Sequence, residues 1–221
     1  FKIMYDKVFL TGSDKNNEWM LKWWLANYRK NSELPVIFAD FGLSKSMRKW
    51  VDQEFDHVMD IPNPDRLAWF LKPLSIIQAS NLSKKVCWID TDCHILKPID
   101  DIFKYTTNGK ISMVRDKPWT KRFNETWHNS GVVAVEGVPD ILRQWEKAIR
   151  TSGERGDQEV LHAMMGGDEL RRRTYIEDIP NTYNWLRLQV EADREDSKNK
   201  KIMHWTGAKG KNRIREIMKN G

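Results

Sequence analysis

Residues 85–92 read Lys-Val-Cys-Trp-Ile-Asp-Thr-Asp, a short apolar run that ends in two aspartates one residue apart. Val86, Trp88 and Ile89 predict a buried strand, and the polar run at 83–85 precedes it. A strand of a parallel sheet delivers its last residues to the carboxyl edge, where open α/β sheets bind ligands. The two aspartates are therefore expected at a ligand-binding edge.

The spacing of Asp90 and Asp92 lets both carboxylates reach one divalent cation if the backbone turns at Thr91. Oxygen ligands of this kind suit Mg²⁺ or Mn²⁺, and a metal held in this way keeps positions open for substrate phosphates. The same pattern also occurs where an aspartate caps a helix. The motif by itself leaves both interpretations open.

Strand and helix patterns alternate along the first half of the chain. Strands are predicted over 7–12, 35–39, 57–59 and 86–89, and helices over 19–28, 44–55 and 67–79. Pro73 either interrupts the last of these helices or sits in its first turn. This βαβαβαβ order predicts an α/β fold with a mostly parallel sheet and helices on both faces.

The second half of the chain changes its pattern. Strands are predicted over 111–114, 131–135 and 201–204, and helices over 141–149, 158–165 and the basic C-terminal residues. The polar stretch 181–200 is predicted to be irregular and to wrap over the site as a lid. With no repeat and no linker, residues 1–221 are expected to form one domain.

The charge balance favours anionic partners. The chain carries a net charge of +6, which suits nucleotide phosphates, nucleic acid or acidic membrane surfaces. The basic run 171–173 is expected to be a surface feature. No apolar run approaches the roughly 18 residues that a membrane-spanning helix needs. Cys87 and Cys93 are expected to be reduced, which predicts a cytoplasmic protein.

Four further segments carry polar side chains of the kind found in active sites. They are His-Asn-Ser-Gly-Val at 128–132, Gly-Asp-Gln-Glu-Val-Leu at 156–161, Asp-Ile-Pro-Asn-Thr-Tyr-Asn-Trp at 178–185 and His-Trp-Thr-Gly-Ala-Lys-Gly-Lys at 204–211. Together with the paired aspartates, their order resembles the GT-A glycosyltransferases, and most closely the retaining family 8 enzymes of the glycogenin and lipopolysaccharide galactosyltransferase type. The resemblance spans residues 7–211 and implies a Rossmann-like GT-A domain.

The resemblance implies a metal site that includes the far end of the chain. Asp90, Asp92 and His204 would hold Mn²⁺ or Mg²⁺, and the ion would bridge the diphosphate of a nucleotide sugar, expected to be a UDP-sugar. Such a metal neutralises the charge that builds on a departing nucleoside diphosphate. The C-terminal segment 201–221 is then expected to close the donor site.

One departure from the family pattern concerns its phosphate-binding lysine. That lysine falls six residues after the histidine, where this chain has Gly210. Lys209 and Lys211 stand on either side, so either could support the diphosphate as a cation. Gly207 belongs to the same donor-binding loop.

The resemblance places further residues around the donor. Thr11 and Gly12 would approach the nucleotide base, and Asp40 lies where the next loop could help. Lys72 falls where the family carries a basic residue near the donor. Thr91, between the two aspartates, is expected to contact the donor as well.

Three residues would surround the transferred sugar. These are Asn129, Asp157 and Gln158, of which Asp157 could equally cap the helix that begins at Gln158. A glutamine side chain is poorly nucleophilic. Sugar transfer with retention is therefore expected to follow a front-face, ion-pair-like route, with Asp157 hydrogen-bonding sugar hydroxyls.

The leading hypothesis is thus a metal-dependent glycosyltransferase that uses a nucleotide sugar. Its acceptor could be a glycan, a protein side chain or a modified base in DNA. A nucleic-acid-binding module without catalysis and a nucleotidyltransferase are the competing classes, although the chain shows no clear glycine-rich phosphate loop for the latter. Aromatic residues flank the predicted site loops and could stack on sugars or on bases: Trp119, Trp127, Trp185 and Trp205.

Overall fold

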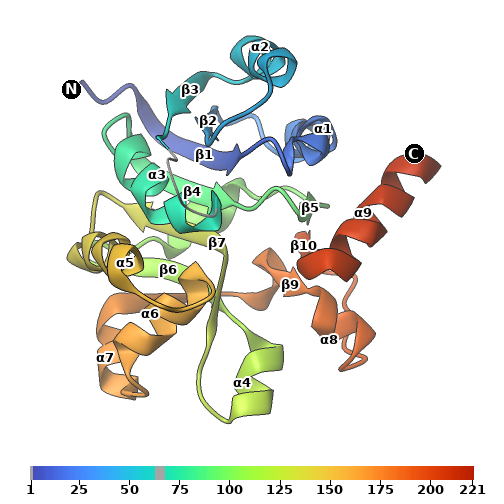
Figure 1. The fold of residues 1–221 in the computed structure, drawn as a ribbon. Helices are drawn as coiled ribbons and strands as arrows, with labels where there is room; N and C mark the ends of the chain where they lie inside the picture. The colour runs from blue at the N-terminus through green and yellow to red at the C-terminus, as the bar shows by residue number, and fades with distance from the viewer. Residues whose placement is uncertain (1, 63–67) are drawn as a thin grey trace.

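A seven-stranded sheet forms the centre of the computed structural model, which describes residues 2–62 and 68–221 (Figure 1). The strand order is β3-β2-β1-β4-β7-β6-β8. Its strands are β1 (Tyr5–Ser13), β2 (Val36–Asp40), β3 (His57–Asp60), β4 (Ser83–Ile89), β6 (Ile111–Arg115), β7 (His128–Glu136) and β8 (Ile176–Ile179). Strand β7 is antiparallel to both of its neighbours, and the other pairs are parallel. The predicted mostly parallel sheet is confirmed.

Helices cover both faces of this sheet, as the sequence predicts (Figure 1). Helices α1 and α2 pack on one face, whereas α3, α5 and α6 pack on the other. Their bounds are α1 (Leu21–Asn31), α2 (Lys45–Glu54), α3 (Lys72–Ala79), α5 (Asp140–Thr151) and α6 (Asp157–Met165). The result is a three-layer α/β architecture that leaves the carboxyl ends of the parallel strands open at one edge.

The central strands are apolar throughout because both of their faces are buried. In β1, Val8 and Leu10 belong to the core under α3 and α5, while Phe9 belongs to the core under α1 and α2. Side chains of a strand point alternately to opposite faces. In β4, Trp88 belongs to the core under α3 and α5, and Ile89 to the core under α1 and α2. Both faces of the strand are therefore packed up to its last residue, and Asp90 follows at the edge of the sheet.

A second, three-stranded sheet lies beside that edge. It consists of β5 (Cys93–Ile95), β10 (Ile202–His204) and β9 (Trp185–Leu186), in the order β5-β10-β9. Strand β10 runs antiparallel to β5, and their register places His204 opposite Cys93. Because β5 begins directly after the paired aspartates, this register carries the histidine next to Asp92.

Several elements differ from the sequence-based expectation. The loop between β6 and β7 contains α4 (Lys117–Phe123), which begins with Asp116 accepting a hydrogen bond from the Trp119 amide. The predicted irregular stretch 181–200 instead contains β9 and α8 (Arg187–Glu191). The C-terminal helix α9 (Gly207–Asn220) is present as expected.

Two further expectations concern single residues. Leu67, the expected first residue of the helix before β4, lies outside the described residues, and Pro73 sits in the first turn of α3. The basic run 171–173 falls in α7 (Glu169–Tyr175), and its middle member Arg172 is buried. Arg172 is ion-paired with Glu169 and Asp178, so the expectation of a surface run was wrong for that residue.

Among the described helices, none combines the length and apolarity that crossing a bilayer requires.

Candidate functional site

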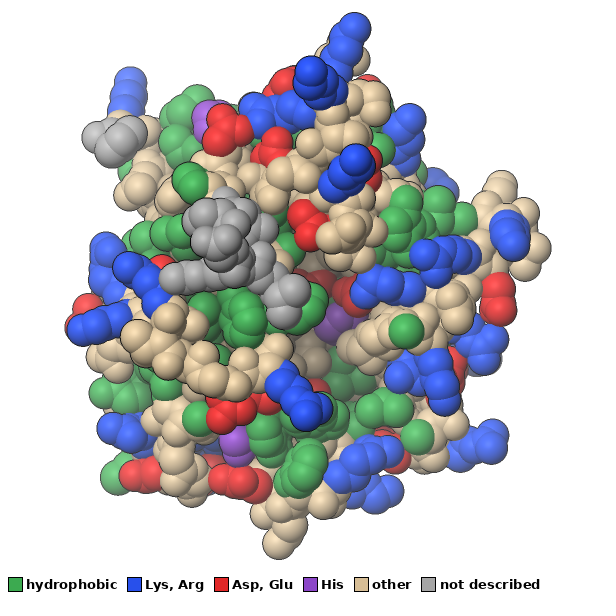
Figure 2. Space-filling model, viewed as in Figure 1, with side chains coloured by type: hydrophobic (Ala, Val, Ile, Leu, Met, Phe, Trp, Pro, Cys, Tyr) green, Lys and Arg blue, Asp and Glu red, His purple; other side chains and the backbone are tan. Residues whose placement is uncertain are grey.

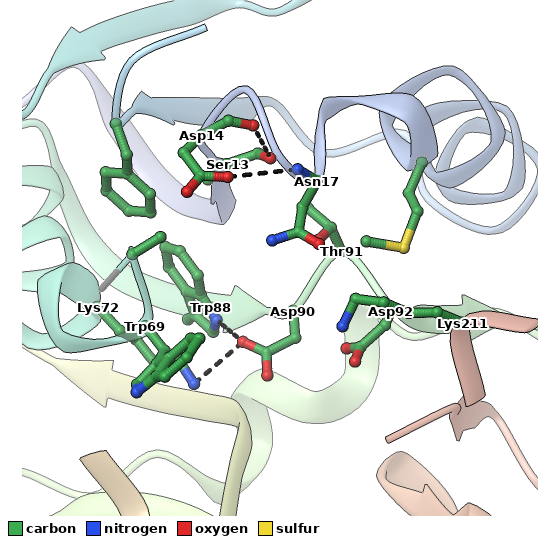
Figure 3. A pocket seen from close by; sticks show the side chains of 14 residues that line it. Ser13, Asp14, Asn17, Trp69, Lys72, Trp88, Asp90, Thr91, Asp92 and Lys211 are labelled. Atoms are coloured by element: carbon green, nitrogen blue, oxygen red, sulfur yellow. Dashed lines mark hydrogen bonds and ion pairs between the residues drawn. The ribbon is translucent and has the colours of Figure 1, made fainter. Parts of the chain in front are cut away.

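A cavity opens where β1 and β4 end, at the open edge of the large sheet (Figure 3). Neighbouring parallel strands end at the same edge, so their last residues meet there. The cavity is lined by Gly12, Ser13, Asp14, Asn17, Met20, Phe41, Ala68, Trp69, Lys72, Trp88, Asp90, Thr91, Asp92 and Lys211. On the outer surface, a hollow near the centre of the molecule shows acidic and histidine side chains at its floor and basic side chains on its rim (Figure 2).

The backbone turns directly after β4, as the metal-site interpretation requires. The Cys93 amide donates to the Asp90 carbonyl across 3.1 Å, which closes a turn over Thr91 and Asp92. The Asp90 amide donates to the Gly131 carbonyl across 2.8 Å and ties the turn to β7. The paired aspartates therefore form a turn at the sheet edge and do not cap a helix.

The two oxygens of the Asp90 carboxylate have different partners. Oδ1 accepts a hydrogen bond from Trp88 Nε1 at 2.5 Å and lies 3.0 Å from the Lys72 ammonium (Figure 3). Oδ2 lies 3.7 Å from His204 Nε2. Burial raises the pKa of Asp90, and Lys72 opposes that rise. One oxygen is thus held by the protein, and the other points toward the histidine.

Lys72 is a buried cation that joins two carboxylates. Its side chain is 2% exposed, and its ammonium lies 3.0 Å from both Asp90 Oδ1 and Asp157 Oδ2. It also donates to the Ser130 carbonyl across 2.7 Å. Burial by itself lowers the pKa of Lys72, but the carboxylates of Asp157 and Asp90 outweigh burial, so the pKa lies above its ordinary value. Lys72 is charged and fixes both acids.

His204 reaches the aspartates from β10. Its Nε2 lies 3.0 Å from Asp92 Oδ1, and its Nδ1 lies 3.0 Å from Asn184 Oδ1. Burial lowers the pKa of His204, but Asp92 and Asp90 together outweigh burial, and the net shift is upward. The close approach requires Gly131, because a Cβ at that position would stand 2.2 Å from the His204 ring.

The residues around this point fit a hard divalent cation. Ligand-type atoms of Asp92, Cys93 and His204 lie within 4.8 Å of one another, with Asp90 Oδ2 close to the histidine. Carboxylate oxygens are ligands that suit both Mg²⁺ and Mn²⁺ in proteins, and an imidazole nitrogen beside them suits Mn²⁺, the softer of the two ions, better than Mg²⁺. Burial raises the pKa of the Cys93 thiol well above its usual value, so this side chain remains a neutral thiol and a poor ligand for such ions.

A second cavity lies close to the histidine, because Thr206, whose amide donates to the His204 carbonyl across 3.1 Å, lines it. It is lined by Asp116, Trp119, Asn129, Gln158, Glu159, Leu186, Arg187, Leu188, Thr206 and Gly207. Gln158 Nε2 donates to Asp116 Oδ2 across 3.1 Å, and the Ser130 amide donates to Gln158 Oε1 across 3.3 Å. Ser130 Oγ donates to Asp157 Oδ1 across 3.1 Å. These bonds hold the polar groups between the two cavities in fixed orientations.

The structure brings most of the predicted site residues together. Lys211 lines the first cavity, whereas Lys209 is exposed on α9 and lines neither cavity. Gly12 and Thr91 line the first cavity, and Gly207 lines the second.

Two predicted donor contacts lie elsewhere. Thr11 is fully buried and lines neither cavity. Asp40 is also outside both, and its Oδ1 accepts hydrogen bonds from the Gly42 and Leu43 amides, each at 2.8 Å. Its Oδ2 lies 2.8 Å from Arg48. The structure thus gives Asp40 the role of stabilising the turn after β2.

Sequence reasoning missed two residues that hold the site. Asp116 follows β6 in the way that Asp90 follows β4, so a carboxylate directly after an apolar strand was the available signal. Asn184 lies in the polar segment 178–185, but no local pattern marks it as a partner of His204. Its side chain is fully buried.

No family model matches the chain, and no curated protein matches its sequence. Its fold is similar to that of the galactosyltransferase LgtC, solved with donor and acceptor sugar analogues, at 13% identity over 96% of this chain and 95% of that chain, with a TM-score of 0.61. The fold is also similar to that of the glycosyltransferase GlyE of Streptococcus pneumoniae TIGR4, at 14% identity over 92% of this chain and 55% of the GlyE chain, with a TM-score of 0.68. The chain therefore spans about half of GlyE.

Mouse xyloside xylosyltransferase 1 is a third similar structure. It shares 13% identity over 91% of this chain and 97% of its own, with a TM-score of 0.57. At such identities the likeness concerns the fold, and the GT-A architecture predicted from the sequence is confirmed.

Proposed function

We propose that this chain is a glycosyltransferase that uses a nucleotide sugar, a UDP-sugar in the first instance, together with Mn²⁺ or Mg²⁺. The observation that carries the proposal is the convergence of His204 on Asp90 and Asp92, two aspartates that line one cavity together with Lys211. When bound, the metal would neutralise the charge of the donor diphosphate. The GT-A fold supports this assignment by analogy.

Different residues of the chain would bind the phosphates and the base of the donor. Lys211 would pair with the phosphates, because it lines the cavity beside Asp92 (Figure 3). Asp14 and Asn17 line the opposite wall and offer hydrogen bonds to a polar ring such as a uracil. The C-terminal helix, which contributes Lys211, would in this way close the donor site.

The transfer step is proposed to proceed on one face of the sugar. Both oxygens of Asp157 are already engaged, one by Ser130 and the other by Lys72, so this carboxylate is poorly available as a nucleophile. Gln158 is an amide held by Asp116. The bond between the anomeric carbon and the diphosphate breaks, the acceptor hydroxyl oxygen bonds to the same carbon, and its proton passes to the departing diphosphate. This route retains the configuration.

We propose that the second cavity receives the acceptor and that the acceptor is a glycan. Trp119 lines this cavity and packs against Trp127 with ring centroids 4.9 Å apart, which offers an aromatic surface to a sugar. Basic side chains in this region are ion-paired at 2.8–3.1 Å with carboxylates: Arg187 and Arg213 with Glu191, Lys117 with Glu195 and Arg122 with Asp193. Such pairing favours a neutral acceptor over the phosphate backbone of DNA.

Nucleotide release and nucleotide binding together test the proposal. The purified chain would be incubated with Mn²⁺ and a panel of UDP- and GDP-sugars, with and without glycan acceptors, and free UDP or GDP would be measured. Calorimetry of UDP binding with and without Mn²⁺ gives a readout that needs no acceptor. Asp92→Asn should abolish Mn²⁺-dependent UDP binding, whereas Asp6→Asn, an exposed aspartate paired with Lys84, should bind normally. Absence of both release and Mn²⁺-dependent binding in the unmodified chain would refute the proposal.

A further inference from the structure

A continuous row of buried polar side chains leads from the β6–β7 strands to His204. Its members are Asp116, Asn129, Asn184 and His204, each 7% exposed or less. Asn129 Nδ2 lies 3.3 Å from Asp116 Oδ2, and Asn184 Nδ2 lies 2.9 Å from Asn129 Oδ1. Asn184 Oδ1 then lies 3.0 Å from His204 Nδ1. The row connects a strand end of the large sheet with a strand of the small sheet.

The orientation of Asn129 is determined at both ends of its amide. The Gly131 amide lies 2.9 Å from one side-chain atom of Asn129, and because a backbone N–H only donates, that atom must be the oxygen. The other atom faces the carboxylate of Asp116, which accepts a hydrogen bond from it. Both neighbours demand the same assignment.

The orientation of Asn184 follows from that of Asn129. An amide oxygen only accepts, so the Asn184 atom that faces Asn129 Oδ1 must be the NH₂ group. Its oxygen is then left to face His204 Nδ1, and that nitrogen must carry a proton to bond with it. A neutral His204 in this state presents the lone pair of Nε2 toward Asp92 Oδ1 at 3.0 Å and Asp90 Oδ2 at 3.7 Å. Two carboxylates repel that lone pair unless a proton on Nε2 or a cation stands between them, and a metal ion bound there would take the place of the proton.

We propose that Asn184 is a positioning residue that sets the tautomer and ring orientation of His204, so that Nε2 faces the metal position. The inference rests on the proposed function, because it assigns the metal to this site. A second hydrogen bond from the distal nitrogen of a ligating histidine commonly has this effect, and its loss weakens metal affinity about 10- to 100-fold. Asn184 comes from the segment that the sequence suggested as a lid, and the structure makes it part of the site's support.

The experiment compares Asn184→Leu, which removes the acceptor at similar size, with Asn184→Asp, which keeps an oxygen for the Nδ1 proton. Asn184→Ala is the second deletion, in case the leucine does not pack. The matched control is Gln189→Leu: this amide is also fully buried, in α8 of the same segment, but bonds to Asn181 and to the Leu186 amide. Mn²⁺ affinity is measured by electron paramagnetic resonance of the free ion. The His204 tautomer is read from long-range ¹H–¹⁵N spectra of the Mg²⁺-bound chain.

The unmodified chain and Asn184→Asp should both show a protonated Nδ1, and Asn184→Asp should bind Mn²⁺ more tightly than Asn184→Leu, although its second carboxylate oxygen meets Asn129 Oδ1 and lowers stability. Asn184→Leu and Asn184→Ala should bind Mn²⁺ at least about tenfold more weakly and lose the single tautomer. Gln189→Leu should lose stability but keep both readouts. Unchanged affinity and tautomer in a folded deletion variant would overturn the role of Asn184, and so would equal losses in Asn184→Asp and Asn184→Leu. If the unmodified chain itself bound no Mn²⁺ or Mg²⁺, the metal site of the proposed function would fail, and with it this inference.

Discussion

Lys72 and Lys211 both line the candidate donor cavity, but their charges serve different purposes. The Lys72 ammonium is shared between Asp90 and Asp157, with 3.0 Å to each, and it is almost fully buried. Its charge is balanced by these carboxylates before any ligand arrives, and removing it would leave buried acids without their partner. Across the described residues, no carboxylate lies within ion-pair distance of Lys211. Of these two lysines, Lys211 is therefore the one whose charge would be available to the diphosphate of the proposed donor.

This difference predicts the effect of two neighbouring lysines on nucleotide binding. Lys211→Ala should weaken UDP affinity about tenfold, which corresponds to the loss of one charge-assisted hydrogen bond of about 1.5 kcal/mol. Lys209→Ala removes the same charge two residues away on the exposed side of α9 and should leave affinity within about twofold. Calorimetric titration of both variants with UDP and Mn²⁺ makes the comparison. Equal effects of the two substitutions would contradict the assignment of Lys211.

At the scale of the elements, the site depends on the contact between β7 and β10. His204 is delivered by the antiparallel pairing of β10 with β5, and its ring then lies against the backbone of Gly131 in β7. This contact is possible because residue 131 is a glycine: a Cβ at that position would stand 2.2 Å from His204 Cε1 and 2.5 Å from His204 Nδ1. The two sheets meet where a glycine permits it.

Gly131→Ala is accordingly expected to displace the imidazole from the aspartates. Mn²⁺ affinity should fall at least about tenfold, and overpacking of the buried contact should cost about 1–3 kcal/mol of unfolding free energy. Gly153→Ala is the matched control, since nothing lies within 4 Å of a Cβ built there. Urea unfolding and Mn²⁺ titration measure the two effects. A Gly131→Ala protein that bound Mn²⁺ normally would show that the histidine does not need this approach.

At the scale of the whole molecule, one cluster of charges joins the last strand of the large sheet to its neighbours. Asp178 in β8 accepts from His128 Nε2 at 2.6 Å and lies 2.8 Å from Arg115 in β6. Burial raises the pKa of Asp178, but the His128 hydrogen bond and Arg115 outweigh it, and the pKa lies well below its usual value. Burial lowers the pKa of His128, which is therefore neutral in the folded chain under ordinary conditions.

These shifts predict loss of stability in acid. Both folded-state pKa values are depressed, so the unfolded chain binds more protons as the pH falls, and the contribution of each group is present above its unfolded pKa. The contribution of His128 to the unfolding free energy should decline from about pH 6.5, the unfolded value for histidine, and that of Asp178 should add a second decline below about pH 4, the unfolded value for aspartate. Asp178→Asn should flatten the second decline, and Asp6→Asn should not. Urea unfolding from pH 7 to 3 checks this, and an unchanged slope in Asp178→Asn would count against it.

Neighbouring residues along the chain encode the order of the elements and the chemistry at the strand ends. The continuous apolar runs of the central strands, the turn after Ile89 and the carboxylates of Asp90 and Asp92 are properties of adjacent residues, so they can be read from the sequence without knowing which segments pack together. The five motifs in order were sufficient to predict the GT-A architecture. They also placed most of the predicted residues at one edge of the sheet.

The groups that reach this edge from distant segments are set by tertiary packing. Whether His204 reaches Asp92 depends on the register of β10 against β5, and whether Lys211 or Lys209 faces the cavity depends on how α9 packs. The role of Asn184 depends on a hydrogen-bond direction that begins at a backbone amide in β7. Such pairings are set by the packing of segments far apart in the chain, where no spacing in the sequence records the outcome.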